Sequence, residues 1–196
     1  MRGLAGGRGK PDMHAVDDPL EASAPEERPT RLHHHAYVSR NLEATRRFYE
    51  EVVGLPLVAT WCEEEFGRSY CHAFFELADG SCLAFFQFAE PEVTESHAKR
   101  ASTSPFDHIA LTATPELQAK VEARAETLGV ATQRIDHGYC ESLYLRDPDG
   151  LVVELTVDLP DAARGAAQRR QRAIEVLSRW LGGDHTPNND LRRDAK

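Results

Sequence analysis

The pattern of apolar and polar positions divides the chain into two similar halves. In the first half, residues 32–38 alternate as a β-strand does, and residues 41–54 carry apolar side chains at helical spacing. In the second half, residues 106–111 predict a strand and residues 114–129 a helix. Each helix begins after an asparagine or threonine that can cap it and ends at a glycine. The order of elements is therefore repeated.

Each half then continues to further strands around an Asp-Gly pair, at residues 79–80 and 149–150. Asp-Gly pairs between alternating apolar runs are typical of tight turns. We therefore predict an α+β fold of two βαβββ modules, at about residues 31–90 and 105–158, within one domain spanning 30–158.

The flanking segments have a different composition. Residues 1–29 are rich in Gly, Pro, Asp and Glu without apolar periodicity, which predicts a disordered leader. Residues 159–182 predict a C-terminal helix, and residues 183–196 a flexible tail. Apolar residues recur at helical spacing in that helix: Ile174, Leu177 and Trp180. This apolar stripe would pack on its own domain or contribute to a dimer interface.

Composition narrows the choice of partner. The 196 residues carry a net charge of −9, which argues against nucleic acid, and no apolar run is long enough to span a membrane. We predict a cytoplasmic protein with a small-molecule substrate. The four cysteines form no CxxC pair, so we predict buried free thiols at Cys62, Cys71, Cys82 and Cys140.

Two histidines and one glutamate are the candidate metal ligands. His34 and His108 occupy equivalent places in the first strand of each module. Because side chains alternate across a strand, His34 shares a face with the apolar residues that follow it, whereas His33 and His35 point the other way. Glu154 interrupts an apolar strand, and burying its charge is costly without a cation. We hypothesise that His34, His108 and Glu154 bind one divalent metal ion.

Several segments resemble a known family. Residues 34–38, 42–49 and 53–55 resemble the opening module of the vicinal oxygen chelate superfamily, which includes glyoxalases, extradiol dioxygenases, epimerases, and fosfomycin and bleomycin resistance proteins. The resemblance extends over residues 31–157. It implies paired modules whose mixed sheet curves around a metal cavity, and homodimers are common among its members.

The second module resembles extradiol ring-cleavage dioxygenases more specifically. The matching residues are Ile135, His137, Leu143, Tyr144, Asp147, Pro148, Gly150 and Glu154. The resemblance implies that Glu154 is an iron ligand and that His137 and Tyr144 surround the substrate and O2. His72 is a further catalytic candidate, because it has the strand parity of Phe74, the equivalent of Tyr144. Aromatic residues that could form a wall for a planar ring are Trp61, Phe74, Phe85 and Phe86.

The number of ligands favours iron. Alignment of the two Asp-Gly turns puts Ala84 opposite Glu154, so no fourth protein ligand is evident. Two histidines and one carboxylate are typical of Fe(II) oxygenases, with Mn, Ni or Zn as alternatives. In place of a metal, Arg134 or Arg146 could pair with Glu154.

The predicted function is that of an Fe(II)-dependent extradiol-type dioxygenase that inserts O2 into a catechol-like vicinal diol. The alternatives are a glyoxalase-like metal-dependent lyase or isomerase, and a drug-binding resistance protein without catalysis. The last of these would not need the three ligands.

Overall fold

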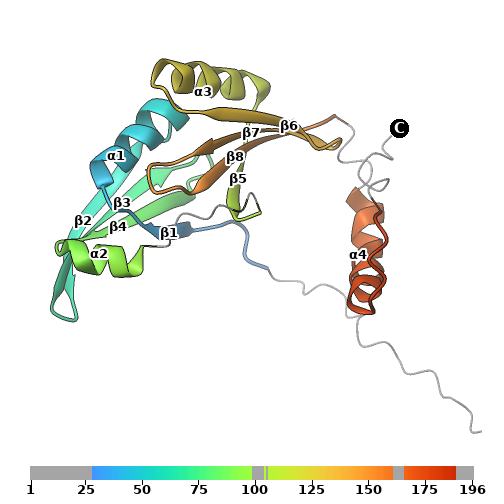
Figure 1. Cartoon of the computed structure of the whole chain (residues 1–196), viewed down its shortest axis with the longest axis horizontal. Coiled ribbons are helices and arrows are strands. Elements are labelled where there is room, and N and C mark those ends of the chain that lie inside the picture. The colour runs from blue at the N-terminus through green and yellow to red at the C-terminus, as the bar shows by residue number, and fades with distance from the viewer. Residues whose placement is uncertain (1–27, 99–103, 105, 161–165, 189–196) are drawn as a thin grey trace, which may run out of the picture.

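A computed structural model describes residues 28–98, 104, 106–160 and 166–188, with two four-stranded mixed sheets and their helices (Figure 1). The elements are β1 (His34–Val38), α1 (Leu42–Arg47), η1 (Phe48–Val53), β2 (Leu57–Glu65), β3 (Arg68–Glu76), β4 (Cys82–Phe88), α2 (Pro91–His97), β5 (His108–Thr112), α3 (Pro115–Thr127), β6 (Thr132–Asp136), β7 (Cys140–Arg146), β8 (Val152–Asp158) and α4 (Ala166–Leu181). Most of the predicted leader and more than half of the predicted tail lie outside the described residues.

The two sheets have the same topology, which confirms the predicted α+β fold with its repeated order. Their strand orders are β1-β4-β3-β2 and β5-β8-β7-β6. In each sheet the first strand runs parallel to the last, and the remaining pairs are antiparallel. The two sheets remain separate and are not closed.

The predicted helix caps are present. The Asn41 side chain accepts a hydrogen bond from the backbone N–H of Ala44 at 3.0 Å, and Thr114 accepts one from that of Leu117 at 3.2 Å. The first helix ends at Gly54, whose φ of 92° suits glycine. Between cap and glycine, however, the α-helix continues as a π-helix, η1, which periodicity alone did not predict.

Helix α2 was also not predicted. It has seven residues and begins at a proline, and Val93 is its buried apolar residue. The Thr94 hydroxyl holds it against β4 by accepting from the N–H of Phe88 and donating to the carbonyl of the same residue. One buried apolar side chain gives too weak a periodic signal to identify a helix.

A single hydrophobic core joins the two modules. It contains apolar side chains from η1, α3 and the facing sides of both sheets: Phe48, Tyr49, Val52, Val53, Ala73, Phe75, Leu83, Phe85, Leu111, Val121, Ala125, Leu143, Leu145, Val153 and Leu155. Arg124 of α3 also donates to the Val53 carbonyl at 3.3 Å. Because the helix-covered sides of both sheets meet in this core, the opposite sides of the sheets face outward.

Helix α4 stands apart from the two sheets (Figure 1). The predicted stripe is exposed, with Leu177 at 53% and Trp180 at 57% of full accessibility. Packing of α4 on its own domain is therefore not seen in the described part of the chain. No described helix is long and apolar enough to cross a membrane.

Candidate metal centre

The strand register places the predicted ligands on the outward side of each sheet. In the first sheet, Ala84 pairs with Ala36 on one side and Phe74 on the other. In the second, Glu154 pairs with Ala110 and Tyr144 in the same way. Ala84 thus occupies the place of Glu154, as predicted.

We call these outward sides the open faces: His34, Ala36, His72, Phe74, Ala84 and Phe86 in the first sheet, and His108, Ala110, Ser142, Tyr144 and Glu154 in the second.

Four of the predicted site residues come together on the second open face. The Nε2 atom of His108 lies 2.9 Å from Oε2 of Glu154. On the other side of the carboxylate, Nε2 of His137 lies 4.0 Å from Oε1. The same His137 nitrogen is 2.9 Å from the Tyr144 hydroxyl, so the two groups share a hydrogen bond. The glutamate therefore lies between two imidazoles.

The charge of this cluster follows from its surroundings. Burial raises the pKa of Glu154. Hydrogen bonds from Ser142 and Tyr144, together with the nearby His108, lower this pKa by more, so the net shift is downward. Although only 5% of Glu154 is exposed, its carboxylate therefore stays ionised near neutral pH. Burial and the adjacent Glu154 raise the pKa of Tyr144 to about 12, so this tyrosine remains a hydrogen-bond donor.

The alternative of an arginine partner for Glu154 is not supported. Arg134 pairs with Glu122 at 2.8 Å, and Arg146 donates to the Gly150 carbonyl at 3.3 Å. The nitrogen atoms near the Glu154 carboxylate are instead those of the two histidines.

The first open face carries aromatic rings around His34. The His34 ring lies 5.7 Å from that of Phe74 and 6.3 Å from that of His72. His72 stacks on Phe86 at 3.7 Å, and Trp61 packs against Phe74 at 4.6 Å. Burial and His34 lower the pKa of His72, so its imidazole is neutral near pH 7. Its buried Nε2 has no hydrogen-bond partner within the described part of the chain.

The neighbours of His34 point away from this face, as strand alternation predicts. His35 packs against Tyr37 at 4.4 Å on the helix-covered side. Phe85, a candidate for the substrate wall, lies on that side too and is 1% exposed. His33 is exposed, with its Nδ1 2.8 Å from Nδ1 of His34.

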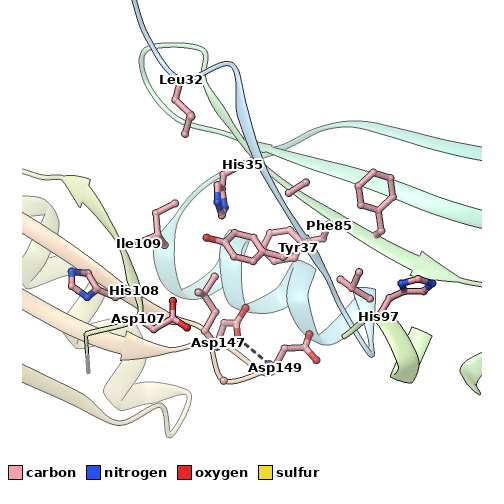
Figure 2. Close-up of a pocket in the computed structure, with 15 residues that line it drawn as sticks. Leu32, His35, Tyr37, Phe85, His97, Asp107, His108, Ile109, Asp147 and Asp149 are labelled. Atoms are coloured by element: carbon pink, nitrogen blue, oxygen red, sulfur yellow. Dashed lines mark hydrogen bonds between the residues drawn. The ribbon is translucent and has the colours of Figure 1, made fainter. Parts of the chain in front are cut away.

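A cavity of about 570 Å³ lies where the two modules meet (Figure 2). His35, Tyr37 and His108 line it, but His34 and Glu154 do not. Among the described residues, no three His, Cys, Asp or Glu side chains are close enough to hold a metal ion. One chain thus brings His108 and Glu154 together but does not add His34 to them.

Comparison with known proteins agrees with this architecture. Residues 31–155 match the family described as the Glyoxalase/Bleomycin resistance protein/Dioxygenase superfamily. The chain belongs to this superfamily. A comparison with curated protein sequences gave no match.

Solved structures share the fold of this superfamily domain. A glyoxylase/bleomycin resistance protein/dioxygenase domain from Frankia sp. EAN1pec is 16% identical, with a TM-score of 0.53 and coverage of 67% of this chain and 100% of its own. A glyoxalase/dioxygenase from Nostoc punctiforme is 22% identical, with a TM-score of 0.50 and coverage of 70% and 99%.

The FosX fosfomycin resistance protein of Listeria monocytogenes is similar as well. Its E126Q mutant, in complex with Mn(II) and 1S,2S-dihydroxypropylphosphonic acid, is 19% identical, with a TM-score of 0.50. The alignment covers 65% of this chain and 92% of FosX. At these identities the likeness shows the fold.

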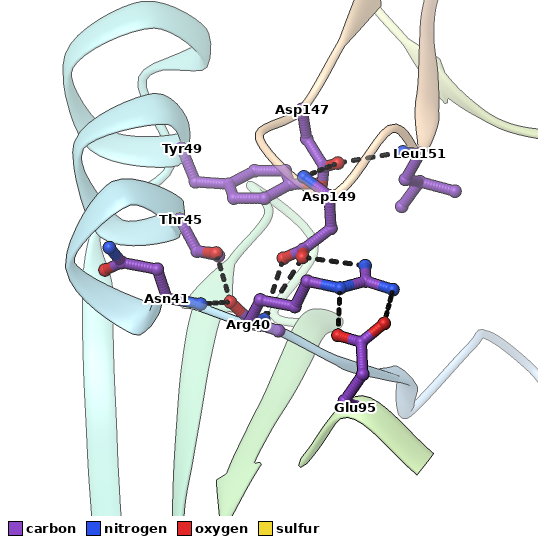
Figure 3. A network of polar contacts seen from close by, with 9 residues as sticks. Arg40, Asn41, Thr45, Tyr49, Glu95, Asp147, Asp149 and Leu151 are labelled. Atoms are coloured by element: carbon purple, nitrogen blue, oxygen red, sulfur yellow. Dashed lines mark hydrogen bonds and ion pairs between the residues drawn. The ribbon is translucent and has the colours of Figure 1, made fainter. Parts of the chain in front are cut away.

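A polar network that the sequence did not reveal ties the modules of the superfamily domain together (Figure 3). Arg40, after β1, donates to Asp149 in the second module and to Glu95 of α2. Tyr49 donates to Asp147 at 3.1 Å. Both aspartates belong to the turn directly before β8, so the network fixes the strand that carries the glutamate.

The buried carboxyl of Asp147 should make the stability of the protein depend on pH in an unusual direction. Burial raises its pKa from 3.8 to about 6. The folded state therefore binds the proton of the Asp147 carboxyl more tightly than the unfolded state does. The stabilisation that this proton gives is present below about pH 4 and is lost as pH rises through about 6. Asp147→Asn can keep the contacts, since its oxygen accepts from the N–H groups of Asp149 and Leu151 while its amide faces Tyr49.

We expect the free energy of unfolding of Asp147→Asn, relative to the natural chain, to rise by up to about 3 kcal/mol between pH 4 and pH 7. Urea denaturation at several pH values measures this difference. Asp79→Asn serves as the control, because Asp79 is an exposed turn residue whose pKa is lowered. A constant difference across this range for Asp147→Asn would contradict the expectation.

Proposed function

We propose that this protein is a divalent-metal-dependent enzyme in which His108 and Glu154 are ligands from the second module and His34 is the ligand from the first. The observation that carries the proposal is the contact of 2.9 Å between His108 and a buried carboxylate that remains ionised. An imidazole nitrogen and a carboxylate oxygen are suitable donors for Fe(II), Mn(II), Ni(II) or Zn(II). A cation there would also compensate the buried charge.

We place the missing His34 on a second copy of the chain. The helix-covered sides of the two sheets share one core, so the open faces are left outward, and His34 is exposed. In a two-fold symmetric homodimer, the first open face of each copy can meet the second open face of its partner. Such a dimer would contain two equivalent centres, each with two histidines and one glutamate.

The reaction that we propose is ring cleavage of a catechol-like diol by O2 with Fe(II). Fe(II) held by two histidines and one carboxylate supplies open coordination positions and redox chemistry for oxygenation. His137 can accept a proton from a substrate hydroxyl, because a neutral imidazole has one ring nitrogen that accepts a proton. Tyr144 stays protonated and can donate a hydrogen bond to a substrate oxygen.

The opposite open face would supply the wall for the substrate ring. Phe74 and Trp61 pack edge to face, and the stacked His72 is neutral, so this surface is apolar and uncharged near neutral pH. An aromatic ring can pack on such a surface without desolvating a charge. His72 would contact the substrate through its unpartnered Nε2.

Oxygen consumption tests this function. The chain is loaded anaerobically with Fe(II) and mixed with a panel of catechols in an oxygen electrode. We expect stoichiometric O2 uptake and a yellow ring-opened product. Absence of uptake with every catechol, in a sample that holds one Fe(II) per chain, would overturn the proposed reaction.

A metal-dependent lyase, isomerase or hydrolase is the second candidate. It draws on the similarity to FosX, whose structure contains Mn(II) and a dihydroxypropylphosphonic acid. Turnover of fosfomycin or of hemithioacetals by the Mn(II)- or Ni(II)-loaded chain, without O2 uptake, would favour it. Binding of a drug without metal or turnover would instead indicate a resistance protein that sequesters its ligand.

Tyr144→Phe gives a narrower prediction. Removing the hydroxyl takes away the hydrogen bond with His137 and a donor to the substrate, so we expect kcat to fall by about a hundredfold with metal content unchanged. Steady-state kinetics and metal analysis measure the two quantities. Tyr70→Phe is the control and should retain activity, because the Tyr70 hydroxyl contacts Glu65 and not the cluster around Glu154. Unchanged kcat and KM in Tyr144→Phe would show that the tyrosine is structural.

A further inference from the structure

Two of the four cysteines face each other on the first sheet. Cys62 of β2 and Cys71 of β3 are direct cross-strand partners. Opposed residues in antiparallel strands have Cα atoms about 4.5–5.5 Å apart, and disulfides span Cα distances of about 4.4–6.8 Å. The backbone therefore already has the spacing that a disulfide requires.

These thiols are accessible and touch each other. Cys62 is exposed and Cys71 is half-buried, which corrects the prediction that all four cysteines are buried. Burial and a hydrogen bond with the Cys62 thiol raise the pKa of the Cys71 thiol. Both cysteines line one cavity of about 570 Å³, with Glu63 and Glu64 beside them. A small reagent can enter this cavity beside both cysteines.

We propose that Cys62 and Cys71 are a redox-active dithiol that closes reversibly into a cross-strand disulfide by exchange with a small uncharged disulfide. The thiolate of exposed Cys62 attacks one sulfur of the reagent, forms a mixed disulfide and releases one small thiol. The Cys71 thiolate then attacks the Cys62 sulfur and releases the second small thiol. The protein loses two electrons and two protons, and the reagent gains both.

The surroundings set the chemical class of the reagent. The carboxylates of Glu63 and Glu64 at the cavity repel anions, so a neutral disulfide should react faster than oxidised glutathione. The next cross-strand pair on the same strands is Trp61 with His72, which lies on the opposite side of the sheet. The dithiol is therefore separate from the open face, and its closure does not depend on the proposed function.

The full-length chain is equilibrated with bis(2-hydroxyethyl) disulfide and 2-mercaptoethanol, quenched with acid and alkylated in denaturant. We expect the number of free thiols to fall from four to two, with no reagent retained in the mass. Trypsin cleaves after Arg68, between the two cysteines, so the disulfide should join peptides 48–68 and 69–99. Reduction should restore all four thiols.

Three variants make the result specific. Cys82→Ser, which removes a cysteine outside this pair, should still lose two thiols. Cys62→Ser and Cys71→Ser cannot close this disulfide. Each should either keep the reagent bound as a mixed disulfide or keep all three of its remaining free thiols. Four free thiols in the natural chain under excess disulfide, or a bond that uses Cys82 or Cys140, would overturn the proposal.

Discussion

Glu154→Gln is expected to lose stoichiometric binding of Fe(II) or Mn(II) while the chain stays folded. Glutamine has nearly the same shape and can still accept from Tyr144, but it lacks the charge that balances a divalent cation. Substitution of residues that hydrogen-bond to metal ligands already weakens metal binding by about 10–100-fold. Loss of the charge of a ligand itself should therefore weaken binding by more than about a hundredfold. Metal analysis after dialysis, together with circular dichroism, measures both properties.

The matched control for this variant is Glu122→Gln. Glu122 is a half-buried glutamate of α3 that pairs with Arg134, away from the open face. It should keep its metal content and its fold. One tightly bound metal per chain in Glu154→Gln would show that the carboxylate is not a ligand.

Phe75→Ala is expected to lower the free energy of unfolding by about 3–5 kcal/mol. Phe75 is fully buried, and its ring lies 5.4 Å from that of Tyr49 and 5.8 Å from that of Phe85. Its removal leaves a cavity in the core that joins the modules. The same strand presents Phe74 on the open face, so the packing of Phe75 also holds the first open face in place.

Urea denaturation of the two proteins measures this loss. Phe66→Ala is the control, because Phe66 is 96% exposed in the turn between β2 and β3 and should change stability by less than about 0.5 kcal/mol. Equal effects of the two substitutions would show that the core does not depend on Phe75.

Local sequence patterns predicted the elements and their faces well. Strand alternation identified His34 rather than His33, and the repeat predicted that Ala84 takes the place of Glu154. These inferences depend only on residues near one another in a strand or at equivalent places in two modules. The sequence also singled out His108 and Glu154, which the structure brings into contact.

Contacts between distant segments could not be predicted in this way. Tyr49 and Asp147 are 98 residues apart, and nothing in their local sequence indicates that they form a hydrogen bond. The alternation of side chains along a strand likewise assigns a residue to one face of its sheet, but it does not say which faces of the two sheets pack together. The separation of His34 from Glu154 within one chain is therefore a property of the three-dimensional arrangement, and it leads to the proposal of a shared centre.

Mixing two inactive variants tests this shared centre most directly. His34→Ala and Glu154→Gln are unfolded together, refolded at equal amounts and assayed for bound metal. Each variant alone should bind almost none. If each centre combines His34 of one copy with Glu154 of the other, about half of the dimers are hybrids with one intact centre, and about a quarter of the natural metal content returns. His108→Ala mixed with Glu154→Gln should recover none, because both ligands come from one module. No recovery with His34→Ala would contradict a centre shared between two chains.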